Sequence, residues 1–293
     1  MSPGTLRILT PAPGILAFYD GRVPGHRFLP GPNWVDDGAI ELGIASYAIL
    51  GGTHALIYDT QVSVSHAKAV RSHLESLGIL RFTVVLSHWH LDHVAGTEVF
   101  ADCPVIANAR TLAHLTEHRA GIEDGTFHGI PAIAPLILPT EVFSGQMSLM
   151  IGTRNVVLIE AEIHSDDATV LWLPDERLLF AGDTLEDPVT YVGMPERLAA
   201  HLADLARLAA LHPARILPNH GAAEVIAAGG YGPGMIAATE AYARHLIGCR
   251  TDQSARALPP QQILAPWIAS GEVLWFAPYT RVHAQNLARV LEA

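Results

Sequence analysis

The chain of 293 residues carries 18 basic and 29 acidic side chains, which gives a formal net charge of -11 at pH 7 with neutral histidines. Hydrophobic residues make up 49% of it and charged residues 16%, a balance typical of a folded globular protein and not of a disordered one. No basic run interrupts the acidic character, so nucleic acid is an unfavourable partner, and two cysteines are too few for a disulfide framework.

The hydropathy pattern predicts a protein that lies outside the membrane. No stretch approaches the ~18 consecutive apolar residues that a membrane span needs. The opening segment, MSPGTLRILTPAPGILAFYDG, lacks the basic region and the unbroken apolar run of a secretory signal. We therefore expect a soluble, cytoplasmic protein with neither a membrane nor a nucleic-acid partner.

The first third of the chain predicts strands separated by one helix. Residues 1–40 are rich in glycine and proline, which favours loops and short strands. Residues 45–60, ASYAILGGTHALIYDT, contain two β-rich runs around a Gly-Gly pair and predict a hairpin. Residues 63–77 then carry apolar side chains at helical spacing, and Gly78 ends that helix. RFTVVLS follows as a continuous apolar strand.

The second half repeats this theme. NVVLIEAE predicts a strand, and DATVLWLPDERLLFAGD predicts a hairpin whose Pro-Asp-Glu segment makes the turn. Residues 194–213 predict a helix, and ARILPNHG predicts a short strand that ends near His220. Two series of strands, each accompanied by helices, favour a layered α/β protein whose sheets carry helices on their outer faces.

The C-terminal region predicts three helices, at 234–248, 260–269 and 279–292. We expect two parts in the chain, a strand-rich domain at 1–230 and a helical extension at 231–293. The extension would pack against the main domain, cap the mouth of an active site or form the face of a homodimer. Its apolar side chains suit each of these roles: Ile236, Leu246, Ile247, Leu264, Trp267, Leu287 and Leu291.

Three histidines and an aspartate crowd into the turn after the RFTVVLS strand. In the segment SHWHLDHVAG, the alternation of His88 and His90 sends both rings to one side of an extended chain, and the turn brings Asp92 and His93 nearby. Imidazole and carboxylate are the ligands expected of zinc. A single metal ion would not bind all four of these side chains. The segment therefore predicts a metal site.

This motif resembles the HxHxDH signature of the metallo-β-lactamase superfamily, whose fold is an αββα sandwich. Further ligands in that family arrive at strand ends downstream, and this chain offers His164 in EIHSDDAT, Asp183 in FAGDT and His220 in PNHG. Asp59 matches an aspartate of the family that ends an early strand and supports the metal loop. The resemblance covers roughly residues 40–221 and implies the same fold, with the helical C-terminal extension added.

The resemblance also implies a ligand set for two metal ions, most simply zinc, although manganese or iron would suit the same donors. His88, His90 and His164 would hold the first ion; Asp92, His93 and His220 would hold the second, with Asp183 as the bridge. The remaining histidines have no evident ligand partner and are expected to be surface or packed imidazoles: His26, His54, His66, His73, His114, His118, His128, His201, His212, His245 and His283.

The implied reaction is hydrolysis by a hydroxide that the two ions share, without a serine or cysteine nucleophile. Asp183 would fix the separation of the ions, and Asp92 would orient the hydroxide. Tyr191 could donate a hydrogen bond to the oxyanion, although a structural phenol is an equally good interpretation. Trp89 is expected to pack beneath the loop or to line the substrate mouth.

The sequence departs from the antibiotic-degrading members of the family. Those enzymes have a cysteine where Asp183 stands and, three positions later, usually a lysine that pairs with the antibiotic carboxylate; here that position is Glu186. Lactonases place a tyrosine there, and residues 222–293 lack the basic cluster that glutathione would need in a glyoxalase II. We expect a hydrolase of an ester, lactone or thioester of a small molecule, and a poor β-lactamase.

Two other functions stay open from the sequence. A mononuclear-iron oxidoreductase resembling persulfide dioxygenase would hold one iron with two histidines and one aspartate. A metal-bearing protein that only binds a ligand is the second. The identity and number of bound ions separate the dioxygenase from a dinuclear hydrolase, and turnover separates both from a binding protein.

Overall fold

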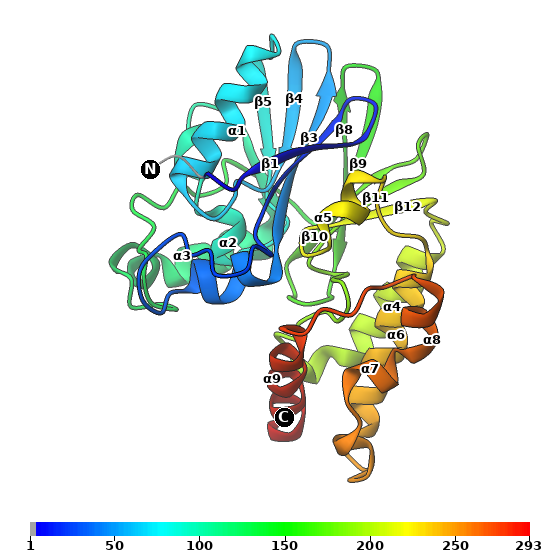
Figure 1. Ribbon diagram of the computed structural model, residues 1–293. Helices are drawn as coiled ribbons and strands as arrows, with labels where there is room; N and C mark the ends of the chain where they lie inside the picture. The colour runs from blue at the N-terminus through cyan, green and yellow to red at the C-terminus, as the bar shows by residue number, and fades with distance from the viewer. Residues whose placement is uncertain (1–3) are drawn as a thin grey trace.

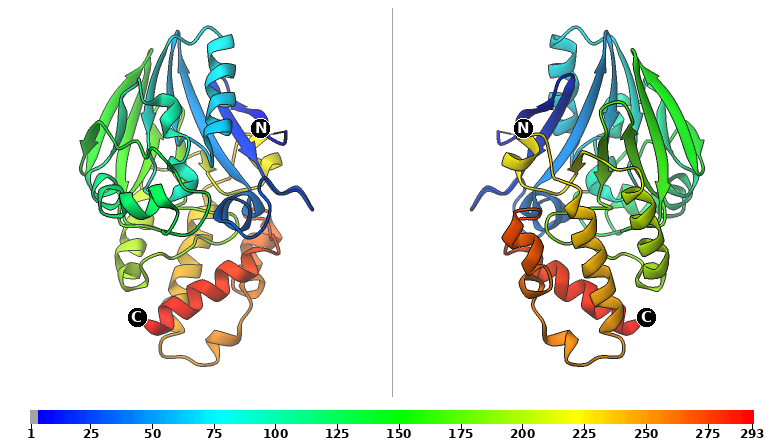
Figure 2. Two further views of the ribbon diagram at one scale, coloured as in Figure 1. Left: turned by 90° about the vertical axis from the view of Figure 1, so that its left-hand side faces the viewer. Right: turned by 90° about the vertical axis from the view of Figure 1, so that its right-hand side faces the viewer.

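The computed structural model of the protein describes residues 4–293 and contains two mixed sheets that pack against each other (Figure 1). The C-terminal helices gather at one end of this sandwich, below the strands in both side views (Figure 2). The predicted fold class, an α/β sandwich of two sheets with a helical C-terminal region, is confirmed.

The first sheet has seven strands that lie in chain order, antiparallel from β1 to β4 and parallel from β4 to β7. These strands are β1 (Arg7–Ala12), β2 (Ile15–Asp20), β3 (Ile44–Gly51), β4 (His54–Tyr58), β5 (Arg81–Val85), β6 (Val105–Asn108) and β7 (Glu141–Phe143).

The second sheet has five strands in the order β12-β11-β10-β9-β8, and only its β11–β12 pair is parallel. These strands are β8 (Gln146–Ile151), β9 (Arg154–Ala161), β10 (Ala168–Leu173), β11 (Leu178–Gly182) and β12 (Arg215–Pro218).

Strand periodicity divides the side chains of the first sheet between two cores. Ile15 and Tyr19 of β2 belong to the core between the sheets, while Phe18 belongs to the core under the helices of the outer face. Successive strand residues point to opposite faces, so a strand buried on both sides is expected to be largely apolar, as β2 is from Ile15 to Tyr19. Across the sandwich, the Tyr47 ring meets Phe180 of β11 edge-on at 5.2 Å.

Helices cover the outer face of the first sheet and one end of the sandwich. Buried side chains of α1 and α3 complete the outer core, and those of α4, α6 and α9 extend the core between the sheets. The helices are α1 (Val64–Ser76), α2 (Leu91–Val94), α3 (Ala109–Asp124), α4 (Leu198–Ala209), α5 (Ala223–Ala227), α6 (Gly234–Gly248), α7 (Pro260–Ile263), α8 (Ala265–Ser270) and α9 (Tyr279–Glu292). A π-helical turn (Val35–Ile40) and 3₁₀ turns (Thr97–Phe100, Pro195–Arg197, Ala255–Ala257) complete the elements.

Most predicted elements are confirmed, including both hairpins and the helix that ends before Gly78. Two predictions were wrong in extent. The helix expected at 260–269 breaks at Leu264 into α7 and α8, because the ring of Pro266 cannot follow an uninterrupted helical turn. The helix expected at 194–213 begins as a 3₁₀ turn and its α-helical part, α4, ends at Ala209.

The C-terminal helices pack on the sandwich through most of the apolar residues expected to do so. Ile236, Leu246 and Leu264 are buried, and only Leu291 is clearly exposed, at 42%. A polar anchor adds to this packing, because the Asp187 carboxylate accepts hydrogen bonds from the Leu274 amide (2.6 Å) and the Tyr231 hydroxyl (2.8 Å). The division of the chain into domains at residue 230 stays a prediction.

None of the helices within residues 4–293 combines the length and the apolarity that crossing a bilayer would require.

The buried Asp187 carboxylate predicts a pH-dependent stability. Burial raises the pKa of Asp187 from 3.8 to about 6. A raised pKa in the folded state favours the neutral carboxyl, so the stability it contributes is present below pH 3.8 and is lost as the pH rises through 6. Asp187→Asn cannot titrate, so native stability should fall relative to the variant between pH 4 and 7, by up to about 3 kcal/mol.

Urea unfolding of both proteins at several pH values measures this difference, with the exposed Asp175→Asn as the control. A difference between native protein and Asp187→Asn that stays constant from pH 4 to 7 would contradict the assignment.

Candidate metal centre

The polar residues of the predicted site follow the ends of five strands. Asp59 comes directly after β4, His88 shortly after β5, His164 after β9, Asp183 after β11 and His220 after β12. The strands that carry them belong to both sheets, and their ends meet at the edge of the sandwich that faces the C-terminal helices (Figure 1). The fold therefore brings together side chains that lie more than 150 residues apart.

The turn after β5 and the short helix α2 that follows it supply four of the candidate ligands. The Trp89 amide donates to the buried Asp167 carboxylate (2.9 Å), which fixes the extended part of the turn. His90 has extended backbone angles and precedes α2, so Asp92 and His93 lie on the first turn of that helix. The His93 carbonyl then accepts from the Thr60 amide (2.8 Å), which ties the turn to the neighbouring loop.

Three imidazoles form the first half of the centre. Nδ1 of His90 lies 2.9 Å from Nε2 of His88 and 2.9 Å from Nε2 of His164. His88 and His164 are almost fully buried, and His90 is partly exposed. Three ring nitrogens that converge in this way form a donor set suited to zinc.

Two carboxylates and two imidazoles form the second half. Oδ2 of Asp183 lies 3.1 Å from Nε2 of His93 and 3.4 Å from Nε2 of His220. Oδ2 of Asp92 lies 3.4 Å from each of the same two nitrogens. These four side chains make a second group of donors that could hold a metal ion.

Asp183 lies between the two halves. Its Oδ2 is also 3.7 Å from Nε2 of His88 and 3.7 Å from Nε2 of His164, so one oxygen is within reach of both donor groups. Its Oδ1 is buried and has no hydrogen-bond partner among the described residues. A buried carboxylate oxygen without a partner is costly unless a cation satisfies it, so this observation fits a metal site.

A second layer of contacts orients the histidines. Nδ1 of His93 lies 2.9 Å from Oδ2 of Asp59, and Nδ1 of His88 lies 2.8 Å from Oγ of Ser87. Backbone carbonyls face two more of the five rings: that of Gly43 lies 2.8 Å from Nδ1 of His220, and that of Tyr191 lies 3.1 Å from Nδ1 of His164. In these four rings each partner leaves Nε2 directed into the centre, where it can bind a metal ion.

Three residues at the centre hold backbone conformations in the left-handed region. Asp59 has φ of 65° and His164 has φ of 71°, although neither is glycine. Gly182, directly before Asp183, has φ of 56°, and a Cβ there would lie 2.8 Å from the Tyr58 hydroxyl. Such conformations cost about 1–3 kcal/mol each in residues other than glycine and cluster at functional sites.

The charges of the centre perturb the pKa values of its members. Burial lowers the pKa of His88 well below its ordinary value and that of His90 to about 3. Burial would raise the pKa of Asp183, but the neighbouring His93 and His220 hold it well below its usual range. Burial would lower the pKa of His93, yet the Asp183 and Asp92 carboxylates raise it well above 6.5. The carboxylates therefore create a potential that attracts cations.

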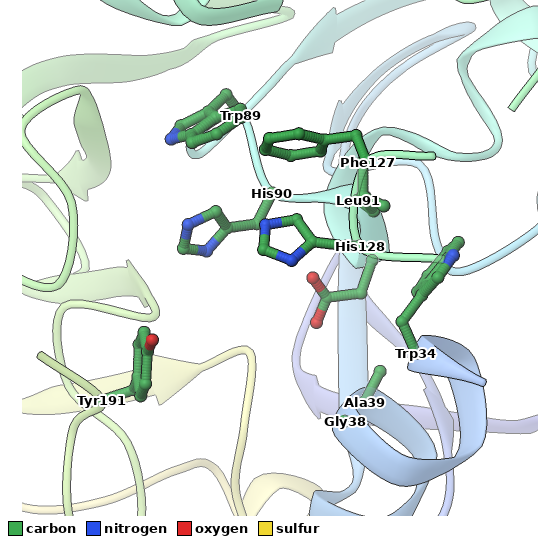
Figure 3. A pocket seen from close by; sticks show the side chains of 10 residues that line it. Trp34, Gly38, Ala39, Trp89, His90, Leu91, Phe127, His128 and Tyr191 are labelled. Carbon is green, nitrogen blue, oxygen red and sulfur yellow. The ribbon is translucent and has the colours of Figure 1, made fainter. Parts of the chain in front are cut away.

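Two cavities open onto the centre. The first, which we call the metal cleft, has a volume of about 220 Å³ and is lined by Asp92, Asp183, Glu186, Tyr191 and His220, with Arg281, Val282 and Gln285 of α9 on its far wall. The second, which we call the aromatic cavity, has a volume of about 250 Å³ and shares His90, Asp92 and Tyr191 with the cleft. Figure 3 shows Trp89, Phe127 and Leu91 along one side of it, Trp34 beside them and Tyr191 opposite.

All seven ligands predicted from the sequence lie in the two donor groups, although their role in binding metal stays a prediction. Tyr191 lies at the junction of the cavities, with the Arg289 guanidinium 5.1 Å from its ring centre. Trp89 lines the aromatic cavity and also packs on α3, so both of its expected roles are consistent with the structure.

Glu186 neither points into solvent nor pairs with an arginine. It is 2% exposed and lies in the wall of the metal cleft. Its Oε1 accepts from the Tyr191 amide (2.8 Å) and its Oε2 from the hydroxyl of Tyr279 on α9 (3.0 Å). Oε1 also lies 3.5 Å from Nδ1 of His164, so Glu186 supports a candidate ligand from inside the protein.

Sequence reasoning missed the residues that form the walls of the cavities. Trp34, Phe127 and His128 come from loops or turns, and Arg281 and Gln285 come from the C-terminal helix. Loop residues have no periodicity that would reveal their direction. The sequence does place Trp34 and Phe127 in segments rich in glycine. An aromatic residue in such a segment is the signal that could have indicated the wall of a cavity.

Comparison with known proteins agrees with this geometry. A sequence profile of the metallo-beta-lactamase superfamily matches residues 39–220. The chain is 26% identical over 209 residues to the beta-lactamase-like protein 2 homolog of Caenorhabditis elegans, which covers 68% of this chain and 60% of the relative. It is 27% identical over 165 residues to the atrochrysone carboxyl ACP thioesterase of Claviceps purpurea, which covers 53% of this chain and 47% of the relative.

The chain therefore spans about half to three-fifths of the length of these curated relatives. Among solved structures, a metallo-beta-lactamase from Pontibacter korlensis superposes with a TM-score of 0.63 at 15% identity and covers 82% of this chain and 99% of its own. At this identity the likeness concerns the fold. The resemblance expected from the HxHxDH motif is confirmed.

Removal of Asp183 should weaken metal binding. A ligand present at about 100 times its dissociation constant stabilises a protein by about 2.7 kcal/mol, so zinc should raise the melting temperature of the chelator-treated native protein by roughly 5 °C. In Asp183→Ala most of that increase should disappear, because the shared oxygen is lost. The control is Asp175→Ala, at an exposed position. If zinc raised the melting temperature of all three proteins equally, Asp183 would not be a metal ligand.

Proposed function

The chain belongs to the metallo-beta-lactamase superfamily, and on this basis we propose that it is a dinuclear zinc hydrolase that cleaves an ester, lactone or thioester of a small apolar molecule. One observation carries the proposal. Oδ2 of Asp183 lies 3.1–3.7 Å from four imidazole nitrogens, two in each donor group. A carboxylate in that position suits a pair of cations better than a single one.

The donors fit zinc. His88, His90 and His164 would hold one ion; Asp92, His93 and His220 would hold the other, with Asp183 shared. Manganese or iron would also suit these ligands. A zinc pair, when bound, polarises a carbonyl and makes water acidic enough to attack at neutral pH.

Asp92 is the carboxylate ligand best placed to contact the attacking water. It is 20% exposed, against 5% for Asp183, and it lines both cavities. Its Oδ2 faces His93 and His220, so its other oxygen remains to accept a hydrogen bond from a water molecule in the cleft. We assign Asp92 the task of orienting that water.

Tyr191 is the candidate donor to the carbonyl oxygen of the substrate. Its ring is partly exposed at the junction of the two cavities, and its amide is held by Glu186. Burial raises the pKa of Tyr191, so its hydroxyl stays protonated at neutral pH and can donate a hydrogen bond.

The aromatic cavity supports a substrate with an apolar group. Trp34, Trp89, Leu91 and Phe127 line it directly beside His90 and Asp92. A cavity of about 250 Å³ suits a single ring or a short acyl chain next to the bond that breaks. The thioesterase from Claviceps purpurea among the relatives makes thioesters a natural first choice.

The proposal predicts both metal content and substrate preference. Zinc-reconstituted protein should contain two zinc ions per chain and should hydrolyse members of a panel of thioesters, lactones and aryl esters. Within the thioesters, a phenylacetyl substrate should exceed an acetyl substrate in kcat/KM by about tenfold, because burial of a ring in the aromatic cavity contributes about 1–2 kcal/mol. Metal analysis and steady-state kinetics measure both quantities.

Other outcomes would select a different function. One iron per chain with consumption of oxygen and a persulfide would make the protein an oxidoreductase. Absence of turnover across the whole panel, with two zinc ions bound, would make it a binding protein.

Glu186 predicts that the protein is a poor β-lactamase. A β-lactam brings a carboxylate into a cleft whose wall holds this buried carboxyl group, and like charges a few ångströms apart cost more than ~1.4 kcal/mol in a protein environment. The kcat/KM for a cephalosporin should therefore be at least about tenfold below that for a neutral lactone. Glu186→Gln keeps the shape of the side chain and should raise the ratio of β-lactam to lactone turnover.

Glu176→Gln, at an exposed turn, serves as the control. Equal hydrolysis of both substrates by the native protein, or a ratio that Glu186→Gln leaves unmoved, would show that Glu186 does not set this preference.

A further inference from the structure

A second group of metal-ligating side chains lies on α3, outside the metal centre. His114, Glu117 and His118 occupy positions i, i+3 and i+4 of this helix, in the segment HLTEH. Residues at this spacing share one face of a helix, so their side chains can reach a common point. Each of the three offers one ligand atom, and these atoms lie within 4.8 Å of one another.

The surroundings hold the two imidazoles in place. Nε2 of His114 lies 2.8 Å from Oδ1 of Asp166, in the loop between β9 and β10, which fixes the orientation of that ring. Both rings also stack on the indole of Trp89, His114 at 5.0 Å and 25° and His118 at 5.0 Å and 22°. Side chains that are already oriented lose little conformational entropy when they bind an ion.

The group is open to solvent and is negatively charged. Glu117 is exposed, and His114 and His118 are partly exposed, so an ion can enter without any rearrangement of the core. The carboxylates of Glu117 and Asp166 supply negative charge beside the two imidazole donors. Histidines four residues apart on one helical face, with a nearby carboxylate, form a donor set typical of zinc, nickel and copper sites.

We propose that His114, Glu117 and His118 bind one additional transition-metal ion of the zinc, nickel or copper type, separate from the metal centre. One connection between this site and the metal centre is Trp89, whose neighbours in the chain are the candidate ligands His88 and His90. Because Trp89 stacks on both imidazoles and lines the aromatic cavity, an ion at this site lies next to a fluorescent reporter.

The test uses full-length protein whose metal centre has first been loaded with zinc. Equilibrium dialysis against Ni²⁺ counts the ions bound, and tryptophan fluorescence follows their quenching of Trp89. His118→Ala removes one ligand, His114→Gln removes another and keeps a donor toward Asp166, and His73→Ala removes a partly exposed imidazole from a different helix as the control.

The native protein and His73→Ala should bind one more Ni²⁺ ion per chain than His118→Ala. In His114→Gln the affinity for that ion should fall by about tenfold or more. Loss of a group that only supports a ligand already lowers metal affinity by about tenfold, and this variant loses a ligand itself. In the native protein, part of the tryptophan fluorescence should be quenched as the additional Ni²⁺ ion binds. This quenching should disappear in Trp89→Phe. Retained zinc in the centre shows that each variant has folded.

Equal numbers of Ni²⁺ ions in all four proteins would overturn the proposal, as would an additional ion that persists in His118→Ala. Quenching that is unchanged in Trp89→Phe would place the ion elsewhere. None of these results depends on whether the protein hydrolyses an ester.

Discussion

The convergence of five imidazoles and two carboxylates, most of them buried, is the constraint on which the rest of the structure depends. Without a cation, three ring nitrogens would face one another at about hydrogen-bond distance and Oδ1 of Asp183 would stay buried without a partner. Such an arrangement is unfavourable for a polar cluster by itself. The left-handed backbone of His164 and the contacts that orient four of the five rings hold the cluster in an arrangement that can accept metal.

The C-terminal region is part of the same arrangement. Tyr279 of α9 donates to Glu186, which lies 3.5 Å from His164. Asn286 of the same helix accepts from the Val192 amide (2.8 Å) and donates to the Thr190 carbonyl (2.9 Å), so both neighbours of Tyr191 are fixed by α9. Helix α9 therefore shapes the metal cleft from two sides: it supplies part of the far wall, and it holds the loop that carries Tyr191.

The seven candidate ligands could be predicted because His88, His90, Asp92 and His93 form the HxHxDH motif, and His164, Asp183 and His220 each follow an apolar strand in the order that the resemblance implies. The parts that depend on loops could not be found. Nothing in the local pattern shows that Trp34 and Phe127 line one cavity, or that Glu186 is buried against Tyr279. The sequence does not predict helix α3, so His114 and His118 are expected to be surface or packed imidazoles, and the fold reveals that they share a helical face with Glu117.

Anomalous diffraction at the zinc absorption edge, from crystals of the zinc-reconstituted protein, tests the arrangement of the centre most directly. We expect two strong peaks in the cluster, one beside His88, His90 and His164 and one beside Asp92, His93 and His220, with the Asp183 carboxylate between them. The two ions should lie about 3.5–4 Å apart, as in other two-metal hydrolytic sites. A single peak at full zinc occupancy, or two peaks with Asp183 bound to neither, would contradict the dinuclear centre.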